Sequence, residues 1–222
     1  MSGYPDYKQS RTSFGINVMK SIVVEIEASD GTIGISAGQG GAPACYIIEE
    51  HFKRFIVGQD PRNLNKIWDQ MFLSSRYYGG KGLPLWAISA VDLALWDLIG
   101  ILRQEPVYQM IGGAVRDEIE LYCTGARPDL AKESGFIGGK MPIPHGPADR
   151  IEGLNANVDK FREMREKVGP NFHIMADCWM ALDVPYAVDL AYALRELGVY
   201  WIEEALHPDD FDGYKLLKER AP

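Results

Sequence analysis

The chain has 222 residues and a formal net charge of −8, enough for one large domain or two small ones with an apolar core. The negative charge argues against nucleic acid or an anionic membrane surface as a partner, and we expect neither a membrane-spanning run nor a secretory leader in this sequence. Three widely spaced cysteines, Cys45, Cys123 and Cys178, favour reduced thiols in the cytoplasm over a disulfide framework.

The first predicted elements are a strand hairpin and two helices. Alternation places Ile22, Val24 and Ile26 on one face of a strand, and the turn at Ser29-Asp30-Gly31 predicts a hairpin. The glycine-rich run Gly38–Gly41 lacks the Lys-Ser/Thr pair of a phosphate-binding loop, which favours a flexible loop. The predicted strands cover residues 21–28 and 32–36, and the predicted helices cover residues 46–56 and 63–73.

A third predicted helix, residues 84–102, is apolar nearly all round. Such a helix is buried on most sides or lies at an interface between subunits. Its two acids, Asp92 and Asp97, do not share a face, so we interpret each as structural, satisfied by the backbone or by a cation. A turn follows, and we place a domain boundary near Asp117.

From Glu118 onward strands and helices alternate regularly, which is typical of a βα barrel. We count four strand–helix units in this part, whereas a closed barrel needs eight. The predicted strands cover residues 119–124, 136–140, 172–176 and 199–202, and the main helices cover residues 128–133, 150–168 and 184–198.

The last two strands each end in an acid, Asp177 and Glu203. Strands joined by a right-handed helical crossover run parallel, so both acids finish at the same rim of the sheet, where barrel active sites lie. Two carboxylates that meet there favour a hard divalent cation between them, Mg²⁺ before Ca²⁺. The alternative is that each acid merely opens a loop or caps a helix. Cys178 has no basic partner assigned by the sequence, and we interpret it as a packing residue.

Several stretches resemble the enolase superfamily, in its mandelate racemase branch, over nearly the whole chain. The resemblance implies an α/β fold with an α+β cap: an enolase-type capping domain over residues 1–117, then the first four strand–helix units of a (β/α) barrel over residues 118–222. On this basis we expect the start of the cap and the second half of the barrel to lie outside the chain. The stretches that carry the resemblance are Ala90–Leu98, Met175–Asp177 and Trp201–Glu204, with the more specific Gln9–Val18, Gly112–Ile119, Thr124–Glu133 and Gly135–Pro142.

The resemblance also implies a function, dehydration of a sugar acid by α-proton abstraction through a metal-stabilised ene-diolate. Asp177 and Glu203 would be the first and second Mg²⁺ ligands, and Arg11 and Lys140 would bind the substrate. The guanidinium of Arg11 suits a carboxylate, although composition alone would make it a solvated tail residue.

The sequence departs from the family pattern at Pro142, where many members carry a lysine base. We therefore assign no catalytic base in this chain. The resemblance implies that a His-Asp dyad serves as the base, and we expect this dyad and the third metal ligand beyond Pro222. His145 lies just past this strand and could touch substrate, although a histidine in Pro-His-Gly-Pro is more often at the surface.

These departures predict that the chain by itself is inactive. The alternative is a non-catalytic remnant or an incomplete gene model that binds metal weakly or only associates with other chains. In either case we expect a homo-oligomer, with no nucleic-acid or membrane partner.

Overall fold

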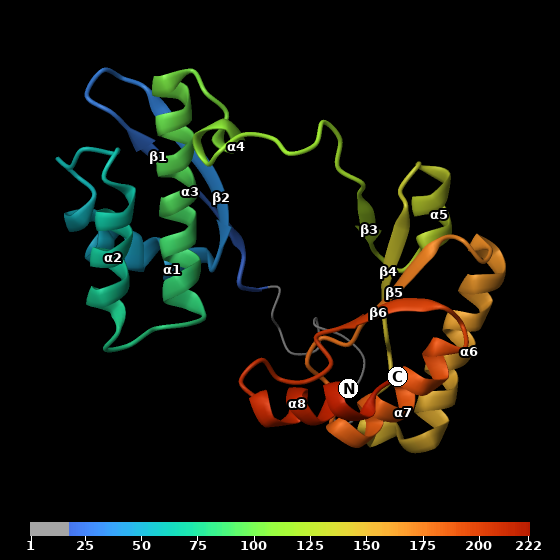
Figure 1. Ribbon diagram of the computed structural model, residues 1–222. Helices are drawn as coiled ribbons and strands as arrows, with labels where there is room; N and C mark the ends of the chain where they lie inside the picture. Colours follow the sequence, from blue (N-terminus) through green and yellow to red (C-terminus); the bar gives the residue numbers. More distant parts are fainter. Residues whose placement is uncertain (1–17) are drawn as a thin grey trace. The chain divides into compact units, whose positions relative to one another are not determined.

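The computed structural model describes residues 18–222, and residue contacts divide them between Asp117 and Glu118 into two compact units (Figure 1). We refer to these as the N-terminal unit and the C-terminal unit. Each has its own sheet and its own hydrophobic core.

The N-terminal unit contains an antiparallel hairpin of β1 (Ser21–Glu27) and β2 (Ile33–Gln39). Ile22 is buried and Val24 and Ile26 pack against the same core, whereas Val23 is 66% exposed. The predicted hairpin and its apolar face are therefore confirmed.

The prediction of a flexible loop at the glycine run is wrong. Gly38 lies within β2, and Gly41 begins helix α1 (Gly41–Tyr46). A Cβ atom at Gly38 would lie 2.7 Å from the Cβ of Ala90, so a glycine here allows the strand to lie directly against helix α3 (Leu83–Arg103). Gly40, between them, has φ 109°, a conformation that side chains rarely adopt.

The single helix predicted over residues 46–56 is also wrong. After α1 the chain winds as a π turn, η4 (Ile47–His51), and then as a 3-10 turn, η5 (Phe52–Phe55). Phe52, one of the apolar positions of the predicted helix, is fully buried in the core. Helix α2 (Leu64–Ser75) then lies close to its predicted place.

Helix α3 (Leu83–Arg103) is the central helix of the N-terminal unit, followed by the short α4 (Val107–Met110). Its length and composition would suffice to cross a membrane, which corrects the expectation that the sequence has no such run. Within the N-terminal unit, however, the side chains of Ala87, Ile88 and Val91 are fully buried. The Oδ2 atom of Asp97 accepts a hydrogen bond from the backbone N–H of Ile35 at 2.8 Å, so this acid is structural, as predicted.

The C-terminal unit is built on four parallel strands in the order β3-β4-β5-β6, and Figure 1 shows its helices alongside that sheet. The predicted alternation and parallel pairing are confirmed. The strands are β3 (Tyr122–Thr124), β4 (Gly138–Pro142), β5 (His173–Asp177) and β6 (Val199–Glu203). The helices are α5 (Pro128–Glu133), α6 (Arg150–Val168), α7 (Val184–Arg195) and α8 (Phe211–Arg220), with a short 3-10 turn η6 (Pro147–Asp149) before α6.

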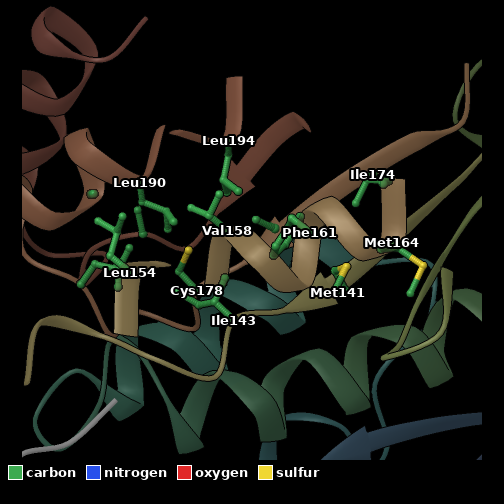
Figure 2. Packing of buried hydrophobic residues seen from close by; sticks show 14 of the residues in the cluster. Met141, Ile143, Leu154, Val158, Phe161, Met164, Ile174, Cys178, Leu190 and Leu194 are labelled. Carbon is green, nitrogen blue, oxygen red and sulfur yellow. The ribbon is translucent and has the colours of Figure 1, made fainter. Parts of the chain in front are cut away.

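The core of the C-terminal unit lies between this sheet and its helices, as Figure 2 shows. Met141 and Ile174 contribute from neighbouring strands, and Phe161 and Leu190 contribute from α6 and α7; all four are fully buried. Because side chains alternate along a strand, the residues between these positions point to the opposite face of the sheet.

Arg165 on α6 holds the end of the sheet opposite to the strand-end acids. Its guanidinium donates to four backbone carbonyls, those of Gly169, Phe172, Leu197 and Gly198, at distances of 2.6–2.9 Å. These carbonyls precede β5 or β6, so one side chain ties both strand starts to α6. Partial burial lowers the pKa of Arg165 from its ordinary value.

Replacing Arg165 by methionine should therefore destabilise the C-terminal unit. We expect Arg165→Met to reduce the free energy of unfolding by about 2–3 kcal/mol, because hydrogen bonds from a charged donor are lost and carbonyls are left without a partner. Urea unfolding followed by circular dichroism measures the change. The matched control is Arg162→Met on the same helix, where an exposed ion pair with Asp159 should contribute less than about 1 kcal/mol. Equal losses in the two variants would contradict this role.

Candidate active site

Three charged side chains project from neighbouring strands onto the sheet face opposite the helix-covered core. Met141, Ile174 and Ala176 belong to that core, and the alternating positions carry Lys140 and Asp177. In the pairing of β5 with β6 the Cα atoms of Asp177 and Glu203 are direct partners. The two acids therefore end neighbouring parallel strands at the same rim, which is the arrangement that the crossover pattern predicted.

The ammonium of Lys140 lies between the two carboxylates. Its Nζ is 3.3 Å from Oδ2 of Asp177 and donates a short hydrogen bond to Oε1 of Glu203. The Lys140 side chain is only 9% exposed, and that of Asp177 is 14% exposed. Lys140 starts two positions below the rim, in register with Met175, and its long side chain carries the charge up to the acids. The sequence predicted that Lys140 binds substrate, and the ion contacts of Lys140 with both acids were not predicted.

The second oxygen of each carboxylate is held by a tryptophan N–H group. Oδ1 of Asp177 accepts from the backbone N–H of Trp179 at 3.2 Å, and Oε2 of Glu203 accepts from the indole Nε1 of Trp201 at 3.1 Å. The indole contact could have been suspected from the i, i+2 spacing of Trp201 and Glu203, which places both residues on one face of the strand. Each acid therefore presents its remaining oxygen to Lys140.

The ion contacts shift the pKa values of this cluster. Burial alone would lower the pKa of Lys140, but hydrogen bonds to Glu203 and Asp177 outweigh it, and the pKa is raised. The hydrogen bond from Lys140, helped by that from Trp201, lowers the pKa of Glu203 despite partial burial. Lys140 is therefore a cation and Glu203 an anion over the whole physiological pH range.

The loops that leave these strands contain strained backbone. Trp179, Met180 and Glu204 have φ of 48°, 61° and 48°, values that cost of order 1–3 kcal/mol each for residues other than glycine. Hydrogen bonds between the two strand ends hold them there, from Cys178 N–H to Glu203 O at 2.9 Å and from Met180 N–H to Glu204 O at 2.6 Å. Strain of this kind concentrates at functional sites.

Asp177 and Glu203 fit a hard divalent cation. Both side chains offer oxygen ligands, and Mg²⁺ is commonly held by one or two carboxylates. Oδ2 of Asp177 and Oε1 of Glu203 already face one cationic group, the ammonium of Lys140. Within residues 18–222 no group of three or more His, Cys, Asp or Glu side chains could hold a metal, so Asp177 and Glu203 are two candidate ligands without a third among these residues. Arg11, the other predicted substrate residue, lies outside the described residues.

The other candidates have structural surroundings. The backbone of His145 is pinned by the buried side chain of Asn157, whose Oδ1 accepts from His145 N–H at 3.2 Å and whose Nδ2 donates to His145 O at 3.0 Å. The ring Nδ1 of His145 lies 3.5 Å from Oδ2 of Asp149. Cys178 is fully buried in the core, and burial raises the pKa of its thiol, so it is a packing residue as predicted.

Comparison with known proteins gives consistent matches. Residues 7–112 match the family described as mandelate racemase / muconate lactonizing enzyme, N-terminal domain, and residues 127–222 match the enolase C-terminal domain-like family. L-rhamnonate dehydratase of Saccharopolyspora erythraea is 57% identical over 222 residues, which are 100% of this chain and 57% of that protein.

Solved structures agree with these sequence matches. L-rhamnonate dehydratase from Gibberella zeae has a TM-score of 0.95 and 52% identity, covering 99% of this chain and 56% of that one. The Gibberella zeae enzyme complexed with Mg gives the same TM-score of 0.95 and identity of 52%, over 99% of this chain and 54% of that one. The chain thus spans little more than half the length of these relatives.

The ion contact between Glu203 and Lys140 should make the free energy of unfolding depend on pH in the acid range. The folded-state pKa lies below the ordinary value of 4.5, so the stabilisation is fully present above that value and is lost as pH falls through the lower folded-state pKa. We expect Glu203→Gln to flatten the decline in the free energy of unfolding between about pH 6 and pH 3. The exposed Glu219→Gln serves as the control and should follow the wild type. An unchanged decline in Glu203→Gln would contradict the ion contact.

Proposed function

We propose that this chain, which belongs to the mandelate racemase / muconate lactonizing enzyme family of the enolase superfamily, forms part of a Mg²⁺-dependent dehydratase that converts L-rhamnonate to 2-keto-3-deoxy-L-rhamnonate. The N-terminal unit is the enolase-type cap, and the C-terminal unit is the first part of the barrel, so the expected fold class is confirmed. The observation that carries the proposal is the convergence of Asp177 and Glu203 at one rim, in a chain 57% identical to an L-rhamnonate dehydratase.

In this proposal Asp177 and Glu203 hold the metal, and Lys140, with Arg11, binds the carboxylate of the sugar acid. Mg²⁺, when bound, would offset the negative charge that develops on the substrate carboxylate as the α proton leaves. The N–H groups of Trp179 and Trp201 keep the two acids oriented, since each binds the carboxylate oxygen that does not face Lys140. The ammonium of Lys140 supplies a fixed positive charge beside the place where that substrate charge develops.

Self-association and location remain predictions from composition. Leu93 and Ile101 on α3 are 54% and 50% exposed, which suits a helix that also contributes to contacts between copies of the chain. We retain the expectation of a homo-oligomer in the cytoplasm, with no nucleic-acid or membrane partner.

The metal assignment is tested by removing one ligand. We expect Asp177→Asn to weaken binding of Mn²⁺, a spectroscopic substitute for Mg²⁺ with similar oxygen preference, by more than about tenfold. Electron paramagnetic resonance of free Mn²⁺ gives the dissociation constant. Asp189→Asn is the matched control, because Asp189 is an exposed acid on α7. If both variants bind Mn²⁺ as the wild type does, Asp177 is not a ligand.

The isolated 222-residue polypeptide should not turn over L-rhamnonate at an enzymatic rate. We assign no base within these residues, because Pro142 stands where many family members carry a lysine base and the His-Asp dyad is expected in the part of the relatives that this chain does not span. Lack of a base commonly costs about 10²–10⁴ in rate. The measurement is release of the keto product with saturating Mg²⁺, with full-length Gibberella zeae L-rhamnonate dehydratase as the positive control. Turnover close to that of the control would contradict the prediction while supporting the substrate assignment.

A further inference from the structure

We propose that Lys140 is a built-in occupant of the metal position, and that a divalent ion displaces its ammonium from Asp177 and Glu203 and so frees it for the substrate carboxylate. The inference rests on the proposed function, because it takes the two acids as the metal ligands. It adds an order of binding: the metal ion enters first, and the sugar acid follows.

The hydrogen bonds around the acids define a single shared position. The outer oxygens are engaged by Trp179 N–H and the Trp201 indole, which leaves one inner oxygen on each acid, Oδ2 of Asp177 and Oε1 of Glu203. The Lys140 Nζ contacts both inner oxygens. An ion bound to the same two oxygens would have to take the place of the ammonium.

Charge makes the two occupants mutually exclusive. A dication and an ammonium within contact distance repel each other strongly in a site where Lys140 is only 7% exposed. The two carboxylates also need a cation at all times, because their Cα positions are paired across adjacent strands and their charges would otherwise repel. The ammonium therefore stabilises the metal-free state and opposes metal binding.

Displacement leaves Lys140 with an unpaired charge at the rim. Its backbone is fixed in β4 between β3 and β5, so only the flexible side chain can turn away from the acids. An anionic group placed beside the metal would then be the nearest partner for the freed ammonium. This is why the sugar acid should bind the metal-loaded protein in preference to the metal-free protein.

Removing Lys140 should therefore tighten metal binding. We expect Lys140→Met to bind Mn²⁺ about tenfold or more tightly than the wild type, since a competing positive charge is lost. Lys160→Met is the matched control, because Lys160 donates to the carbonyl of Pro142 at 2.8 Å, close to the same rim. We expect its dissociation constant to stay within about threefold of the wild-type value. Equal or weaker Mn²⁺ binding by Lys140→Met, with a normal control, overturns the inference.

A measurement on the wild type covers the case in which Lys140→Met fails to fold. Labelling by an amine-reactive reagent, mapped by mass spectrometry, should increase severalfold at Lys140 when Mn²⁺ saturates the protein. Lys132, which donates to the carbonyl of Val168 at 2.8 Å, is the internal control and should keep its labelling rate. Unchanged or reduced labelling of Lys140 overturns the inference.

The Asp177→Asn variant distinguishes failure of the metal assignment from failure of the displacement by Lys140. If it binds Mn²⁺ as tightly as the wild type, the metal assignment fails and the inference fails with it. If Asp177→Asn binds weakly and Lys140→Met also binds weakly, the metal assignment stands and only the displacement is wrong.

Discussion

The pairing of three parallel strands, β4, β5 and β6, is the constraint on which the candidate site depends. Their registers place Pro142 beside Asp177 and Asp177 beside Glu203. Because side chains alternate, a shift of one residue in either pairing would turn an acid from the rim into the apolar core. The packing of Met141 and Ile174 against α6 and α7 therefore fixes the register and, with it, the meeting of the charges.

Electrostatics and backbone strain act together at this rim. One ammonium between two carboxylates leaves the cluster with a formal net negative charge, so Lys140 does not fully neutralise the two acids. The left-handed residues Trp179, Met180 and Glu204 would relax if the strand ends separated. The hydrogen bonds between the segments that follow β5 and β6 resist that separation, which favours holding the two acids next to each other at the rim.

Much of this arrangement could be predicted from sequence because it follows from short-range patterns. Apolar runs that end in acids, joined by a helical segment, are sufficient to infer parallel strands and a shared rim for Asp177 and Glu203. The bridge by Lys140 could not be inferred in this way, since it depends on a side chain reaching from two positions lower on a neighbouring strand.

The errors in the N-terminal unit have a similar origin. Gly38 lies in β2 where a side chain would collide with Ala90 on α3, and the winding changes from π to 3-10 within residues 47–55. The close approach at Gly38 involves an element distant in the sequence. Patterns within one segment carry no information on such contacts.

The same geometry bears on how the two acids are kept together. A monovalent ammonium offsets the repulsion between two carboxylates only in part, and its burial carries a desolvation cost even though it belongs to the chain. In our proposal a dication would offset more charge at the same oxygens but would have to come from solution, so its binding would be opposed by the ammonium that it replaces. Lys140 of β4 would then lower the metal affinity and, at the same time, keep the two acids in place.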